Sequence, residues 1–88
     1  MKADHAKVSQ ALKTARGQID GILRMVDEDR YCMDISNQLL ATEALLKKTN
    51  KLVLEAHLHS CVAESFSSGT DVDQKIGEII RLLDKLTN

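Results

Sequence analysis

Residues 31–66 read YCMDISNQLLATEALLKKTNKLVLEAHLHSCVAESF, and this stretch decides the fold. It contains no Pro, no Gly and no cluster of turn residues that would end a helix. The stretch therefore predicts one helix of about 35 residues, which at 1.5 Å per residue is about 50 Å long. Mostly apolar side chains recur at alternating steps of four and three, as on one face of a helix: Ile35, Leu39, Thr42, Leu46, Thr49, Val53 and Ala56.

A shorter helix is predicted on each side of this segment. The first runs from about Asp4 to about Asp27, and the acidic turn 27–30 separates it from the long helix. The third follows the breaker at 67–70, with Thr70 or Asp71 as its cap. The apolar stripe of the first helix is Val8, Leu12, Ala15, Ile19, Ile22 and Val26, and that of the third is Val72, Ile76, Ile79, Ile80, Leu83 and Leu86.

The expected fold class is all-α, a three-helix protomer with one very long central helix. The chain has 88 residues, enough for one domain and not for two, so residues 1–88 are predicted to form a single domain. Such a long helix cannot be covered by so short a chain, and only Tyr31 and Phe66 are aromatic. We therefore expect the chain to oligomerise in order to bury enough apolar surface.

Charge is distributed unevenly although the net charge is only −1. Residues 1–26 carry a net charge of +3 and residues 35–54 a net charge of +2, while 27–34 and 55–88 are each −3. This pattern is weak evidence that the two positive segments bind an anionic partner, and ordinary solvated helix faces explain it equally well.

No run of 18 apolar residues is present, and the first residues, MKADH, do not resemble a signal peptide. We therefore expect a cytoplasmic protein that does not contact a membrane. Thiols stay reduced in that compartment, so Cys32 and Cys61 suggest metal or redox chemistry rather than a structural disulfide.

The candidate ligands lie on the long helix. His57 and Cys61 are four residues apart, which puts both side chains on one face, able to hold one ion. Cys32 lies 25 residues before His57, about 37 Å along a straight helix, so one chain cannot bring these two side chains together. Two helices packed antiparallel about a two-fold axis would place Cys32 of one subunit opposite His57 and Cys61 of the other.

Two thiolates and one imidazole form a soft donor set that suits Cu(I), whereas Zn(II) would usually take a fourth ligand. His59 is out of line with the pair, and His5 is a further possible donor. No nucleophile elbow, phosphate-binding loop or paired carboxylates appear, so neither an enzyme nor a small-molecule substrate is expected.

These residues resemble the CsoR/RcnR family of repressors, and within it the copper-sensing CsoR branch. The resemblance covers nearly the whole chain and rests on RGQIDGI at 16–22, DRYCMDI at 29–35 and HLHSCV at 57–62. It implies a three-helix protomer that forms antiparallel dimers and tetramers, lacks a helix-turn-helix and binds operator DNA when free of inducer.

The resemblance also implies roles for individual residues. Tyr31 stands where the copper branch has a Tyr before the first Cys, and Glu78 matches a Glu that is hydrogen-bonded to the His ligand. The first helix has fewer Arg and Lys residues before Gly17-Gln18 than is usual in the family. The expected contacts to DNA phosphates come from Lys7, Lys13, Arg16, Lys47, Lys48 and Lys51.

The predicted function is a Cu(I)-responsive repressor that binds operator DNA without metal and leaves it when Cu(I) joins Cys32, His57 and Cys61 across a subunit interface. Derepression of copper-export genes follows from the resemblance. The alternative is a persulfide-sensing repressor, similar to the CstR branch, in which Cys32 and Cys61 of two subunits become crosslinked. That branch typically lacks the His, so His57 argues against it.

Overall fold

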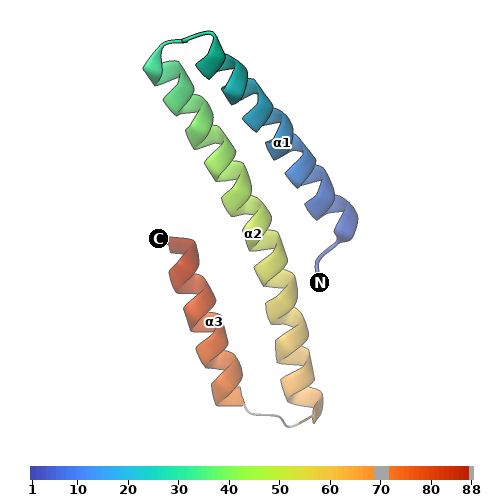
Figure 1. Ribbon diagram of the computed structural model, residues 1–88. Helices are drawn as coiled ribbons and strands as arrows, with labels where there is room; N and C mark the ends of the chain where they lie inside the picture. Colours follow the sequence, from blue (N-terminus) through green and yellow to red (C-terminus); the bar gives the residue numbers. More distant parts are fainter. Residues whose placement is uncertain (69–71, 88) are drawn as a thin grey trace.

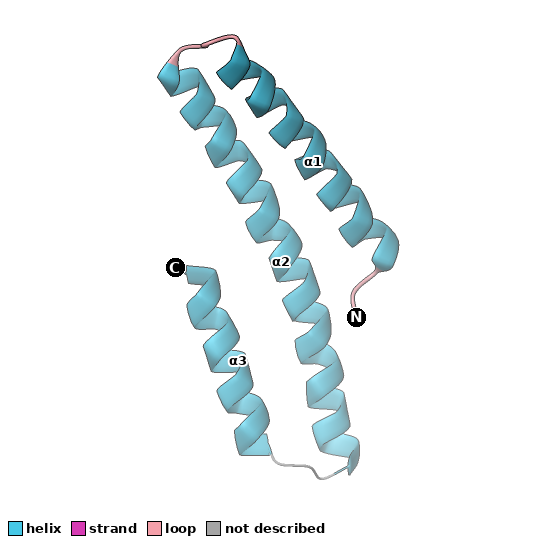
Figure 2. Ribbon diagram, viewed as in Figure 1, coloured by secondary structure: helices cyan, strands magenta, loops and turns pink. Residues whose placement is uncertain are grey.

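A computed structural model of the chain contains three helices: α1 (His5–Asp27), α2 (Cys32–Ser68) and α3 (Val72–Thr87) (Figures 1 and 2). The structure describes the backbone of residues 1–68 and 72–87 and the side chains of residues 1–60, 74 and 77–85. No strand occurs in these ranges, so the predicted all-α fold with a long central helix is confirmed. The predicted cap of the third helix, Thr70 or Asp71, lies outside the described residues.

The three helices form a single flat layer. Helix α1 packs along the N-terminal part of α2, and α3 packs along the C-terminal part on the other side (Figure 1). The Cα atoms span 58 × 27 × 12 Å, so the third dimension is about the width of one helix. None of the helices is long and apolar enough over its described residues to cross a membrane.

This layer leaves much of the chain open to solvent. The radius of gyration is 17.5 Å, whereas a compact chain of this length would have about 12 Å. The accessible surface is 6634 Å², against about 5,200 Å² expected for a compact monomer of this mass. A single copy therefore buries less surface than an independently stable domain of the same size.

The interface between α1 and α2 uses only half of the stripe predicted on α1. Val8, Ala15 and Ile22, spaced seven residues apart, are buried. The intervening members of the stripe, Leu12, Ile19 and Val26, remain 46–55% exposed. Because α1 contacts a single helix, one line of side chains meets α2 and the adjacent line stays available to another surface.

On α2 the residues buried against α1 are polar. Thr42 and Thr49 are each only 5% exposed. The Thr42 hydroxyl donates to Gln18 Oε1 at 2.8 Å and also lies 3.2 Å from the carbonyl oxygen of Gln38, while Thr49 donates to the carbonyl oxygen of Leu45 at 2.8 Å. These bonds satisfy the buried hydroxyls, so small polar side chains can pack there without loss of stability.

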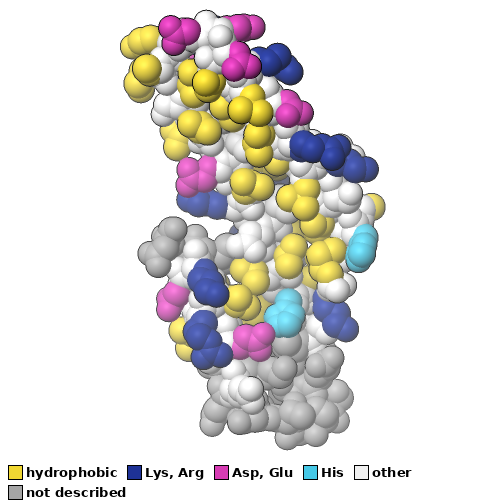
Figure 3. Space-filling view, viewed as in Figure 1, with side chains coloured by type: hydrophobic (Ala, Val, Ile, Leu, Met, Phe, Trp, Pro, Cys, Tyr) yellow, Lys and Arg dark blue, Asp and Glu magenta, His cyan; other side chains and the backbone are white. Residues whose placement is uncertain are grey.

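Some of the exposed apolar side chains of α1 and α2 form a band on one broad face of the layer, which we call the apolar band (Figure 3). Each helix contributes residues at a helical spacing, with Leu39 and Leu46 seven residues apart on α2. Apolar residues that are about half exposed on both helices indicate a surface that another protein surface covers. The band consists of Leu12, Ile19, Leu23 and Val26 of α1 and Leu39 and Leu46 of α2.

The turn between α1 and α2 depends on Asp29, whose φ of 55° lies in the left-handed region. Around it the Arg30 N–H donates to the Met25 carbonyl at 2.9 Å and the Asp29 N–H to the Val26 carbonyl at 3.0 Å. This pair of bonds is the Schellman motif that ends many helices, with Asp29 at the position usually held by Gly. The motif reverses the chain and directs α2 back along α1.

Replacing Asp29 with Gly should raise the free energy of unfolding by about 0.5–1 kcal/mol, because Gly adopts this φ without the clash of a Cβ atom. Asp29→Val should lower it by about 1–2 kcal/mol for the same reason. Urea denaturation at equal protein concentration measures both. Asp27→Gly, inside α1, serves as the control and should not raise the free energy of unfolding. Equal stability of the two Asp29 variants would contradict the left-handed conformation assigned to Asp29.

Candidate metal centre and DNA-contact residues

A polar contact between side chains joins His57 of α2 to Glu78 of α3. His57 Nε2 lies 2.9 Å from Glu78 Oε1, and the two side chains are 41% and 38% exposed. A carboxylate only accepts, so Nε2 carries the proton and donates it to Glu78 in this hydrogen bond. The bond therefore orients the imidazole and assigns its lone pair to Nδ1, as carboxylates do for many metal-binding histidines.

His57 and Glu78 both line a pocket of about 270 Å³. The contact between His57 and Glu78 agrees with the expectation from the family resemblance, which did not extend to the other residues around the pair. Met1 and Lys2 reach this pocket from the segment before α1, and no local pattern signals an approach between residues more than 50 positions apart. The pocket is lined by Met1, Lys2, Val53, Leu54, His57, Glu78 and Leu82.

Cys32 is the first residue of α2, exposed and with a free thiol. It precedes His57 by 25 residues, about seven helical turns, and Cys61 by 29 residues, about eight turns. Whole numbers of turns put positions 32, 57 and 61 on one side of α2. The side chain of Cys61 itself lies outside the described residues.

A single chain does not bring Cys32 to His57. Helix α2 is continuous from Cys32 to Ser68, so about 37 Å separates the two positions. Among the residues whose side chains are described, no three His, Cys, Asp or Glu residues lie together as a metal site would require. Tyr31, 67% exposed and directly before α2, is at the Cys32 end and thus remote from Glu78 in the same chain.

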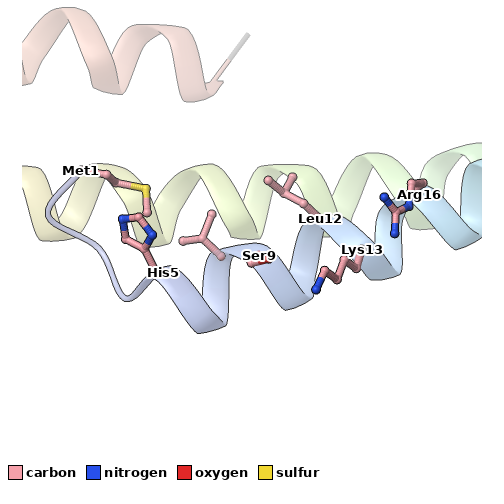
Figure 4. A pocket seen from close by; sticks show the side chains of 7 residues that line it. Met1, His5, Ser9, Leu12, Lys13 and Arg16 are labelled. Carbon is pink, nitrogen blue, oxygen red and sulfur yellow. The ribbon is translucent and has the colours of Figure 1, made fainter.

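The other histidines lie apart from the His57–Glu78 pair. His5, the first residue of α1, lines a cavity of about 540 Å³ with Met1, Lys13 and Arg16 (Figure 4). His59 is exposed two positions after His57, where it does not share the same face of α2.

The six basic residues expected to contact DNA do not form one continuous face in a single chain. Lys13 and Arg16 line the cavity beside His5, whereas Lys7 lines the grooves next to Leu52 on another side of α1. Two of the three lysines of α2 lie in ion pairs within the helix, Lys47 with Glu43 at 3.2 Å and Lys51 with Glu55 at 3.9 Å. Such exposed pairs are weak and can be exchanged for phosphate contacts.

Gly17 and Gly21 are not tightly packed against the described part of the chain. A Cβ atom at Gly17 would meet nothing there within 4 Å, and one at Gly21 would meet the Arg24 guanidinium at 3.8 Å.

Known proteins with a similar sequence or structure are metal-responsive regulators. Residues 4–85 match the family described as metal-sensitive transcriptional repressor. The copper-sensing transcriptional repressor CsoR of Bacillus subtilis (strain 168) is 41% identical over 81 residues, 92% of this chain and 79% of that protein.

Two solved structures share the fold. The nickel-responsive transcriptional regulator InrS superposes with a TM-score of 0.84 at 26% identity, over 98% of this chain and 96% of that one. The copper-sensing repressor CsoR with Cu(I) from Geobacillus thermodenitrificans NG80-2 gives a TM-score of 0.82 at 30% identity, over 94% and 85% of the two chains.

Glu78→Gln should weaken Cu(I) binding by about 10- to 100-fold, because the neutral amide oxygen accepts the Nε2 proton more weakly than the carboxylate does and the imidazole becomes a poorer ligand. Competition against a chromophoric Cu(I) chelator under anaerobic conditions measures the affinity. Glu55→Gln, an exposed carboxylate on α2, is the matched control and should stay within about twofold of the parent. Equal affinities for Glu78→Gln and the parent would show that the pair has no part in metal binding.

Proposed function

Because the chain belongs to the CsoR/RcnR family of metal-sensitive transcriptional repressors, we propose that it is a Cu(I)-responsive repressor whose residues 1–88 act as one helical sensing and DNA-binding domain. The family consists of transcriptional repressors, not enzymes, and includes copper-sensing members. The observation that carries the proposal is the His57–Glu78 pair on the same side of α2 as Cys32.

The chemistry of these residues fits Cu(I). A thiolate from Cys32, a second from Cys61 and Nδ1 of His57 would together offer one set of soft and intermediate donors, which favours Cu(I). Glu78 supports this assignment because it occupies Nε2 and leaves Nδ1 as the coordinating nitrogen. When bound, the ion would link helices that are otherwise separate.

A second subunit has to supply Cys32. In an antiparallel pair, the two-fold axis passes between the two α2 helices. It lies level with the point midway between Cys32 and the other two proposed ligands, His57 and Cys61, that is, between residues 44 and 47. Leu46, 43% exposed and part of the apolar band, lies in this interval. The proposed dimer therefore covers the apolar band and forms two equivalent sites, and two dimers assemble into the tetramer expected of the family.

The metal-free tetramer binds operator DNA through exposed lysines and arginines, so its affinity falls steeply with salt. Without an obvious recognition helix, sequence preference leans on the shape and deformability of the DNA. His57 and Glu78 couple the site to α3, and Tyr31 of the partner subunit adds a hydroxyl near the same site. The inducer must bind more tightly to the conformation that does not bind DNA. The coupling free energy between two such binding sites is typically about 1–3 kcal/mol.

Anaerobic titration of Cu(I) into the reduced protein, bound to fluorescent DNA from its own promoter, tests the proposal by anisotropy. DNA release should be complete near one Cu(I) per subunit and should require at least about tenfold more Cu(I) in His57→Ala or Cys32→Ser. Ni(II) is the control metal, since a nickel-responsive regulator has a similar structure. Release by Ni(II) and not by Cu(I) would reassign the inducer.

Reactive sulfur is the alternative inducer. A persulfide donor that crosslinks Cys32 to Cys61 of the partner and releases DNA, where Cu(I) does not, would move the protein to the sulfur-sensing branch. Exposure of the Cys32 thiol is compatible with this chemistry.

Leu46→Lys should convert the dimer or tetramer into monomer, because two ammonium groups would meet near the two-fold axis in a desolvated interface. Sedimentation equilibrium at micromolar concentration measures the mass. Leu83→Lys, on α3 and 50% exposed outside the apolar band, is the matched control and should keep the parent's mass. A monomeric parent protein, or an unchanged mass in Leu46→Lys, would refute the proposed interface.

A further inference from the structure

Lys13 and Arg16 form a pair of cations beside the apolar band. Both are exposed, and both line the cavity of about 540 Å³ that Leu12 of the band also lines (Figure 4). No carboxylate lines this cavity, and residues 5–16 contain no Asp or Glu. Over the described residues neither cation takes part in an ion pair. The positive charge of the pair is therefore not balanced within the described part of the chain.

A hydrogen bond between side chains shows the register of α1 against α2. Gln18 Oε1 accepts the Thr42 hydroxyl at 2.8 Å, so these two residues lie at about the same level along the layer. The two helices run antiparallel, so each step toward the C-terminus of α2 matches one step toward the N-terminus of α1 (Figure 1). Val8 and Leu52 line one pocket, in agreement with this register. Residues 44–47 of α2 are therefore level with residues 13–16 of α1.

The two-fold axis of the proposed dimer lies at this same level. A partner that covers the apolar band lies against the broad face to which both α1 and α2 contribute (Figure 3). An axis that reverses the helix direction on this face runs across the layer, over α1 as well as α2. Lys13 and Arg16 of one subunit thus come close to the same two residues of the partner. The dimer gathers four cations around its axis, whereas a single chain has two.

Four cations around one axis repel each other when no anion is bound. Because Lys13 and Arg16 are exposed, water and salt screen much of this repulsion, and the dimer can still form. A phosphate group that binds between the subunits cancels the repulsion and gains contacts from both of them. Guanidinium and ammonium groups are the side-chain groups that bind phosphate best. The cluster therefore favours a phosphate-bearing partner that binds the dimer rather than the single chain.

We propose that Lys13 and Arg16 of both subunits form one composite site on the two-fold axis, and that backbone phosphates at the centre of the operator DNA bind there. A two-fold symmetric protein matches an operator built from two inverted half-sites, and its axis then meets the DNA between them. The site is incomplete without the partner subunit, so dimerisation and DNA binding support each other. The inference rests on the proposed function, since it uses the antiparallel dimer and the operator DNA.

Charge variants of the full-length, metal-free protein test this assignment. Arg16→Gln and Lys13→Gln each remove one charge per subunit from the site, at exposed positions where Gln is a good helix former. Arg16→Lys keeps the charge. Arg24→Gln, in the last turn of α1, is the matched control. For each protein we would measure the dissociation constant of the DNA-free dimer by sedimentation at low and high salt. Anisotropy over a range of salt concentrations gives the affinity for a duplex from its own promoter.

Without DNA, Arg16→Gln and Lys13→Gln should each tighten the dimer by about threefold or more at low salt, and by less at high salt, because fewer like charges meet at the axis. The same variants should weaken DNA binding by about tenfold or more. The slope of log affinity against log salt should fall in magnitude by about 1.8 per dimer, because two phosphate contacts are lost. Arg16→Lys and Arg24→Gln should keep the dimer constant and the salt slope of the parent.

A dimer that is no tighter in either Gln variant, or a salt slope that stays at the parent's value in both, would overturn the inference. Inorganic pyrophosphate that tightens the parent dimer at micromolar concentration and displaces the duplex would assign the site to a small anion, and so overturn its assignment to DNA. A monomeric parent protein would overturn the inference together with the proposed dimer. These measurements use no Cu(I), so a parent that keeps its DNA in Cu(I) refutes the proposed copper response alone.

Discussion

The unbroken helical ladder of α2 is the constraint on which the rest of the molecule depends. A continuous helix from Cys32 to Ser68 is too stiff to fold back, so the candidate ligands at its two ends stay apart. The same length prevents α1 and α3 from covering it, and the chain becomes a layer 12 Å thick. Separated candidate ligands and an uncovered apolar surface thus have a single cause, and the antiparallel partner that we propose would satisfy both.

Polar contacts on the two sides of α2 hold α1 and α3 against it. Buried Thr42 and Thr49 let α1 lie close to α2, and their hydroxyl groups donate hydrogen bonds to neighbouring acceptors. Leu39 and Leu46 do not take part in this contact and stay available to another surface. On the other side of α2, the His57–Glu78 hydrogen bond links α2 to α3. A contact of this kind is suited to a switch because it is partly exposed and can be rearranged at modest energetic cost.

Family membership and site geometry supply different parts of the functional argument. The match over residues 4–85 establishes a metal-sensitive repressor, while neighbours that respond to copper and to nickel share the fold. A common fold does not select the metal, because selection depends on the donor atoms and their geometry. The proposed donors at positions 32, 57 and 61 are of the kind that favours copper, and the Glu78 carboxylate gives the His57 imidazole a defined orientation.

The sequence by itself determined the helices, because apolar spacing and the absence of breakers are local properties of the chain; it likewise fixed the distance between Cys32 and His57, which follows from helical rise alone. Only the tertiary structure decided which half of the apolar stripes of α1 and α2 is buried and that Met1 and Lys2 reach the pocket of His57 and Glu78. These features depend on how helices dock, and docking is set by side chains far apart in sequence that no local periodicity relates.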